Sequence, residues 1–291
     1  METPNPQYSQ MPEIPKEARE KLEAMKGKLD KYAKAMTKDF KDDIIGVALL
    51  PPSKIDPDEK LNEEQIKKLK NAINVLILID LVNKKDNVKI RDTIIKASHA
   101  KAKEIDENIS PLVMDIIEIR ENCLDGKYDI MEMLAVGAPL YDPKDILVAL
   151  KLIEVHKSMV LKKFEKYIVA YCGGGSLFRG EQANDIDVYI IIDDTDVKRM
   201  TRAELKDKLM SIIYGMSHEA AQMIGTKKTL HIQAFILTDF WESIKDAQPV
   251  IYTFLRDGVP FFDRGIFMPW KLLLKSGRIR PSPEAIEMQM D

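Results

Sequence analysis

Cysteine and histidine are scarce in this chain of 291 residues. The two cysteines, Cys123 and Cys172, are far apart and form no metal-binding or redox motif. The four histidines show no zinc-ligand spacing. No Ser-His-Asp ordering, P-loop or dinucleotide-binding fingerprint is present. The sequence therefore gives no support to a zinc site, a thiol redox enzyme, a serine hydrolase or a dinucleotide-dependent oxidoreductase.

Long apolar runs and a strong excess of one charge are also missing. No uncharged apolar run approaches the roughly 18 residues that a membrane span needs. Residues 1–12 lack the basic and apolar regions of a secretory signal, and we expect them to be disordered. The 44 basic and 47 acidic residues give a net charge of −3, which argues against a protein whose main role is coating nucleic acid. We expect a cytoplasmic protein that makes no membrane contact.

Two strand-like segments of the chain resemble each other. Residues 71–80 read NAINVLILID and residues 184–193 read NDIDVYIIID, with six of ten positions identical. Each segment follows a helical pattern and an apolar run that ends in a turn, and each precedes a helix that contains Ser-His. Further strands are predicted at residues 113–119 and 230–237. Both halves then close with Gly-x-Pro, two large apolar residues and Asp.

These repeats predict two tandem copies of one unit, at residues 13–142 and 143–270, followed by a basic tail with a short helix at residues 271–291. The expected fold class is α/β (α+β), in which each copy is a small mixed sheet flanked by helices. The alternative is two unrelated α/β domains whose strands have similar compositions.

The apolar run that starts at residue 168 ends in a glycine-rich bend, Gly173-Gly174-Gly175-Ser176. Glycines allow a sharp turn and close approach of a ligand to the backbone. Consecutive free N–H groups and the Ser176 hydroxyl form a suitable cradle for phosphate oxygens. The alternative is a flexible turn without a ligand.

Asp185 and Asp187 lie two residues apart in the strand that follows, so both side chains point to the same face. Two adjacent carboxylates repel each other unless a cation lies between them, and Mg²⁺ prefers such oxygens together with substrate phosphates. The segment thus predicts a site for a metal-bound triphosphate. The alternative is a strand edge with two unrelated acids, and we expect Asp193 and Asp194 to be solvent-facing acids of that kind.

The combined pattern is Gly175-Ser176-x-x-Arg179-Gly180, four further residues, then Asp185-Ile186-Asp187. It resembles the signature of the DNA polymerase β-like nucleotidyltransferase superfamily, most of all its minimal branch, which modifies small molecules or proteins. The resemblance covers about residues 143–265 and includes the closing segment from Gly258 to Arg264. The gap from Ser176 to Asp185 is slightly shorter than the family usually shows.

The resemblance implies that a hydroxyl group attacks the α-phosphate of a nucleoside triphosphate (NTP) and that pyrophosphate leaves. The protein would contribute positioning and charge stabilisation. The matching residues are Gly174, Gly175, Ser176 and Arg179 for the phosphates and, for two divalent ions (Mg²⁺ or Mn²⁺), the catalytic pair Asp185 and Asp187.

The family usually adds a third acid on a later strand, and the spacing to Thr238-Asp239 puts Gln233 at that position. Glutamine can offer a carbonyl oxygen to a metal but cannot act as a base near neutral pH. His231 has the same strand parity as Gln233 and is a second candidate for the third position.

The first copy has Ala72 and Asn74 at the positions of the two acids, and prolines in place of the glycines of the bend. Proline removes the N–H donors that a phosphate cradle needs, so this copy is predicted to be catalytically degenerate. It keeps an acid, Asp115, at the position that we match to Gln233, which leaves open a composite site shared by the two copies.

The leading functional hypothesis is transfer of a nucleoside monophosphate from Mg-NTP to a hydroxyl acceptor, which is a small molecule, a protein or RNA. The alternative is a non-catalytic nucleotide-binding, RNA-binding or scaffold protein built on the duplicated fold. A basic stretch near the C-terminus is a candidate surface for an RNA or protein acceptor. Its members are Arg264, Lys271, Lys275, Arg278 and Arg280.

Overall fold

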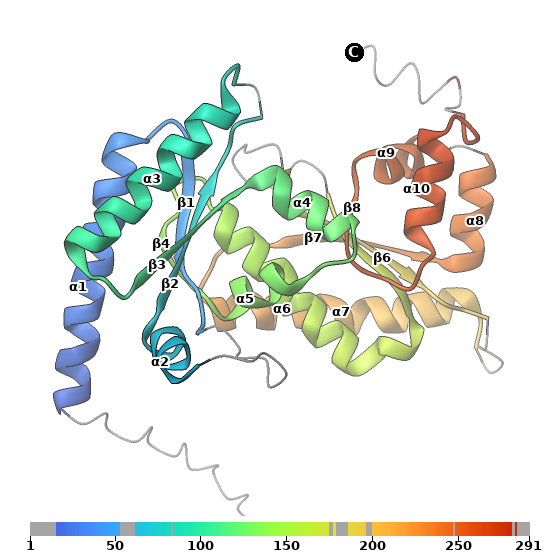
Figure 1. Cartoon of the computed structure of the whole chain (residues 1–291). Coiled ribbons are helices and arrows are strands. Elements are labelled where there is room, and N and C mark those ends of the chain that lie inside the picture. The colour runs from blue at the N-terminus through green and yellow to red at the C-terminus, as the bar shows by residue number, and fades with distance from the viewer. Residues whose placement is uncertain are drawn as a thin grey trace, which may run out of the picture.

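The computed structural model describes residues 16–52, 62–82, 84–174, 177–178, 186–195, 200–246, 248–280 and 283. Two four-stranded mixed sheets, each flanked by helices, confirm the predicted fold class (Figure 1). Among the helices in these ranges, none has the length and apolar character needed to cross a bilayer.

The elements of the first half follow one another as a mixed α/β chain. In order they are α1 (Lys16–Asp39), β1 (Ile44–Leu49), α2 (Glu63–Asn71), β2 (Ile73–Ile79), α3 (Asn87–Ile105), β3 (Ile109–Asp115), α4 (Ile116–Leu124), α5 (Asp129–Val136) and β4 (Ala138–Tyr141). The strand order is β3-β2-β1-β4; β2 and β3 run parallel, and the other pairs run antiparallel.

The second half repeats this arrangement. Its elements are α6 (Ile146–Phe164), the 3₁₀ turn η1 (Glu165–Tyr167), β5 (Ile168–Gly173), β6 (Ile186–Ile192), α7 (Arg202–Ile224), β7 (Leu230–Ile236), α8 (Leu237–Lys245), α9 (Pro249–Asp257), β8 (Val259–Asp263) and α10 (Phe267–Lys275). The order β7-β6-β5-β8 matches the first sheet, with the same strand directions.

The repeat extends to irregular details of the backbone. The register of β1 with β2 shifts between Ile44 and Gly46, and that of β5 with β6 shifts between Ile168 and Ala170. A second register shift interrupts the pairing of β1 with β4 and that of β5 with β8. In each case it falls directly before the residue that pairs with a proline, Pro139 or Pro260. Bulges are specific features of a fold, so two unrelated domains are a poor explanation for this coincidence.

Three sequence expectations need correction. The third strand of the first half is β3, residues 109–115, and not 113–119, because the apolar residues from Ile116 onward belong to α4. The two closing segments, to which no element was assigned from the sequence, form edge strands β4 and β8. The expected boundary at residue 270 lies inside α10, so the C-terminal tail cannot begin there.

Helix α6 is shared by both sheets. Ten of its 19 residues are buried, which fits its apolar residues on all sides. A Cβ added at Gly46 of β1 would meet Leu147 Cδ1 at 2.7 Å, and one added at Gly173 of β5 would lie 3.5 Å from Ile153 Cδ1. One helix therefore packs against a strand of each half.

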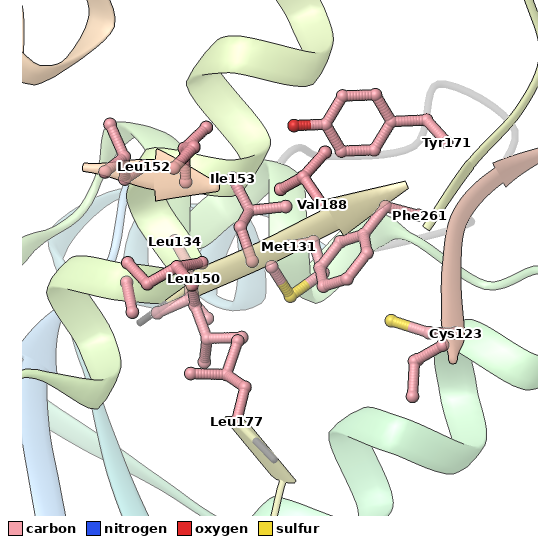
Figure 2. Packing of buried hydrophobic residues seen from close by; sticks show 14 of the residues in the cluster. Cys123, Met131, Leu134, Leu150, Leu152, Ile153, Tyr171, Leu177, Val188 and Phe261 are labelled. Carbon is pink, nitrogen blue, oxygen red and sulfur yellow. The ribbon is translucent and has the colours of Figure 1, made fainter. Parts of the chain in front are cut away.

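The helices form layers around the two sheets. Helices α1 and α3 cover the outer face of the first sheet, α4, α5 and α6 lie between the sheets, and α8, α9 and α10 cover the far face of the second (Figure 1). Figure 2 shows the central cluster, in which α6 meets α5 and the second sheet. Its labelled members include Met131, Leu134, Leu150, Leu152, Ile153, Val188 and Phe261.

Helices α6 and α10 occupy equivalent places and are anchored by the same two contacts. The carboxylate of Asp142 accepts N–H groups of the first turn of α6, as that of Asp263 does for α10. Lys151 donates to the carbonyl of Gly137, and Lys271 donates to that of Gly258. Burial lowers the pKa of Lys151, and it lowers that of Lys271 to about 8.

A buried histidine ties α6 to both β5 and α7. His156 is fully buried; its Nδ1 lies 2.7 Å from the Tyr171 hydroxyl and its Nε2 lies 3.1 Å from the Ile213 carbonyl oxygen. Because a carbonyl only accepts, Nε2 carries the proton of the neutral ring and Nδ1 accepts from Tyr171. Burial lowers the pKa of His156 from 6.5 to about 4.

We expect His156 to make the fold acid-sensitive. The unfolded chain binds a proton near pH 6.5 and the folded chain only near pH 4, so stability is lost as the pH falls through that window, by about 3 kcal/mol in total. Urea unfolding from pH 7 to pH 4 should show a smaller loss in His156→Gln than in wild type. His218→Gln, which changes an exposed histidine of α7, serves as control. Equal losses in wild type and His156→Gln would contradict the assignment.

Candidate functional site

The structure describes four of the predicted site residues. These are Gly174, Asp187, His231 and Gln233. Four others lie outside the described residues, namely Gly175, Ser176, Arg179 and Asp185. The geometry of the site is therefore built from the first group alone.

Gly174 lies directly against Asp187. Its N–H donates to the Asp187 carbonyl at 2.8 Å, which continues the pairing of β5 with β6 by one residue. A Cβ added at Gly174 would meet Asp187 Cβ at 3.0 Å and would lie 3.6 Å from Oδ2. The start of the glycine-rich bend thus approaches the carboxylate as closely as only glycine allows.

The Asp187 side chain belongs to the less buried face of β6. Ile186 and Val188 point into the core, while Asp187 keeps 35% of its side chain exposed. Among the described residues its ion-pair partner is His231, whose Nδ1 lies 2.9 Å from Asp187 Oδ1. The two residues are direct partners in the parallel register of β6 and β7.

Gln233 lies further along the same face. It pairs with Tyr189 and not with Asp187, so the register puts His231 beside the acid. The Tyr189 ring stacks on Phe254 of α9 at a centroid distance of 4.3 Å. Burial and then the Asp187 carboxylate raise the pKa of Tyr189. Sequence reasoning missed Tyr189, although its strand parity with Asp187 was a usable signal.

The equivalent place in the first half is closed. Leu50 donates its N–H to the Asn74 carbonyl at 2.8 Å, as Gly174 does to Asp187, and Leu50 is buried. The Asn74 amide donates to the Pro51 carbonyl at 3.1 Å. In the first half, the position of Gly174 is thus taken by a buried aliphatic side chain, and the residue in the position of Asp187 bonds to the bend itself.

The match between Asp115 and Gln233 is wrong. By register, Leu112 is the equivalent of Gln233, and Asp115 corresponds to Ile236 at the end of β7. Asp115 caps α4: its carboxylate accepts the N–H groups of Ile117 and Leu81. Asp115 thus lies three residues beyond the true equivalent of Gln233, and the geometry gives no support to a composite site.

Asp194 also differs from expectation. It is buried, where a solvent-facing acid was predicted. Its carboxylate accepts the Thr238 hydroxyl at 2.8 Å and pairs with Arg202 Nε at 3.1 Å. These residues line an open pocket of 370 Å³ at the opposite end of β6 from Asp187. Asp194 therefore stabilises the start of α8, as Asp115 does for α4.

One lysine of the basic stretch is engaged in hydrogen bonds within the fold. Lys271 donates to the carbonyls of Leu255, Arg256 and Gly258, which end α9. This contact leaves its ammonium unavailable to an acceptor. The remaining members are exposed, namely Arg264, Lys275, Arg278 and Arg280.

Comparisons with protein-family models, with curated proteins and with solved structures find no match to this chain.

Gly174→Ala tests whether the close approach matters. The added methyl group would press on Asp187 Cβ, which the β6 backbone holds in place, so β6 must give by a few tenths of an ångström and carry the carboxylate with it. We expect the divalent-ion and triphosphate binding predicted from the sequence to weaken by about 10-fold and the free energy of unfolding to fall by about 1 kcal/mol. Calorimetric titration and urea unfolding measure the two effects, with Gly215→Ala, at an open helical position, as control. Unchanged binding would contradict the role of Gly174.

Proposed function

We propose that the second half of the chain transfers a nucleoside monophosphate from an NTP to a hydroxyl acceptor. The observation that carries the proposal is the contact of Gly174 with Asp187, because it brings the glycine-rich bend to the strand face that bears the acid. A glycine beside a partly exposed carboxylate suits a metal-bound triphosphate, which needs backbone N–H groups and a hard oxygen ligand together.

The residues present fit a divalent ion. Asp187 offers carboxylate oxygens on a side chain that is 35% exposed, and within the part of the chain that the structure describes it forms no ion pair with a lysine or arginine. Such an ion, when bound, would neutralise phosphate charge and orient the reacting groups. Asp187 would hold it, Asp185 is its expected partner, and the bend that begins at Gly174 would hold the phosphates.

The second candidate is a non-catalytic nucleotide-binding or scaffold protein. It is favoured by the polar face of β7, where the described residues are His231, Gln233 and Phe235, without a carboxylate. A site that lacks the third acid should activate a hydroxyl nucleophile poorly. Asn74 and the buried Leu50 take the positions of Asp187 and Gly174 in the first half, so we expect no transfer chemistry there.

Incubation with each labelled NTP in Mg²⁺ or Mn²⁺ separates the two candidates. The transferase proposal predicts pyrophosphate release and labelling of the chain itself or of an added acceptor. Thermal stabilisation by NTP and metal without any pyrophosphate would favour the binding protein instead. If no NTP changes either the melting temperature or the pyrophosphate signal, the transferase and the nucleotide-binding protein both fail, and only a scaffold that does not use nucleotide is left.

The acceptor surface follows from the same proposal. Arg264, Lys275, Arg278 and Arg280 leave a positive, exposed segment after β8, which suits an RNA phosphate backbone or an acidic protein. We therefore include single-stranded RNA and an acidic protein among the added acceptors.

A further inference from the structure

The pair formed by Asp187 and His231 joins an oxygen donor to a nitrogen donor on one face of the sheet. We propose that His231 is a metal ligand of this site, and that its imidazole makes the site select Mn²⁺ over Mg²⁺. The inference rests on the proposed function, because the triphosphate supplies the other ligands.

The separation of the two donor atoms fits a shared ion. Oδ1 of Asp187 and Nδ1 of His231 lie 2.9 Å apart. Two ligands at right angles around an ion, with bonds of roughly 2.1 Å, lie roughly 3.0 Å from each other. An ion can therefore replace the hydrogen bond without displacement of either strand, since register already holds the two residues side by side.

The exposure of His231 allows the change of tautomer that ligation needs. To bind an ion, Nδ1 must lose its hydrogen and Nε2 must carry it. The His231 side chain is 64% exposed, so water can accept the Nε2 hydrogen bond.

The ligand type decides which ion is preferred. Mg²⁺ takes oxygen ligands almost without exception, whereas imidazole suits transition metals and carboxylate suits Mn²⁺ as well. An acid at this position would serve Mg²⁺, and an imidazole shifts the balance toward Mn²⁺. Ser110 and Asn74 occupy the two equivalent positions in the first half, so that half should hold neither ion.

Pulsed electron paramagnetic resonance of the whole chain with Mn²⁺ and inorganic triphosphate tests the ligation directly. We expect a nitrogen coupling to Mn²⁺ in wild type and in His218→Gln, and its loss in His231→Gln. Triphosphate serves as probe because it needs no base preference. Substitution of His231, whose side chain is 64% exposed, should leave the urea midpoint of unfolding unchanged.

Competition titrations test the preference. His231→Gln should weaken Mn²⁺ binding by roughly 10- to 100-fold and change Mg²⁺ binding far less. His231→Asp should reverse the preference toward Mg²⁺, and Gln233→Ala should leave it unchanged.

The outcomes separate this inference from the proposed function. Bound Mn²⁺ without nitrogen coupling in wild type, or coupling that survives His231→Gln, overturns the ligand assignment while nucleotidyl transfer through Asp187 can still be measured. If neither ion binds with triphosphate, the ligand assignment and the proposed function both fail.

Discussion

Asp187→Ala should lower pyrophosphate release from NTP by at least about 10²–10³-fold, the range seen when one charge-stabilising group is removed from an active site. The methyl group cannot hold a divalent ion, so the triphosphate charge is left without its counterion. Asp187 is partly exposed on the less buried face of β6, and its neighbours in the core are untouched. The variant should therefore fold, and the loss should fall on transfer and metal binding.

The repeat provides a matched control for this measurement. Asn74 is the residue of the first half that accepts the same strand-continuing N–H bond as Asp187. Asn74→Ala should leave pyrophosphate release within about twofold of wild type, although it removes the amide contact to Pro51. Equal activity in Asp187→Ala and wild type would refute the site, and equal loss in both variants would point to a structural effect.

Leu152→Ala should destabilise the protein by about 2–5 kcal/mol, whereas Leu272→Ala should change stability by less than about 0.5 kcal/mol. Each leucine follows the lysine that donates to the end of the preceding helix, so the two positions are equivalent. Leu152 is 0% exposed because the second sheet covers α6, while Leu272 is 65% exposed because the described residues leave that side of α10 uncovered.

Urea unfolding followed by circular dichroism measures both variants, and the shape of the transition carries a second result. Because α6 packs against both sheets, we expect Leu152→Ala to keep one cooperative transition at a lower urea concentration. Two separated transitions would contradict a core shared between the halves. Similar losses in the two variants would contradict the difference in burial between Leu152 and Leu272.

Periodicity predicted the elements whose burial alternates or repeats clearly. The alternating residues of β6 and the helical pattern of α1 and α6 were sufficient for that reason. The predicted position of β3 was too far along the chain, because Pro111 and Leu112 interrupt the strand pattern and α4 begins with two apolar residues, Ile116 and Ile117. Local sequence cannot separate a strand from a buried helix that follows it without a gap.

The candidate site was predictable in its composition and only partly in its geometry. Strand parity put Asp187, His231 and Gln233 on one face, as observed. Which of His231 and Gln233 lies beside Asp187 depends on the register of β7 with β6, and tertiary packing sets that register. The burial of Asp194 depends on Thr238, 44 residues later, so no local pattern could reveal it.

The position of α6 also sets the order in which the chain can complete its fold. When residue 141 has left the ribosome, all four strands of the first sheet have emerged. Leu147, which packs against Gly46 of β1, has not yet emerged. The inward side of that sheet, including Leu76 and Leu78, reaches its full packing only when α6 has been released. The N-terminal half therefore matures late in synthesis, and chaperones that recognise bare apolar strands would have their opportunity in that interval.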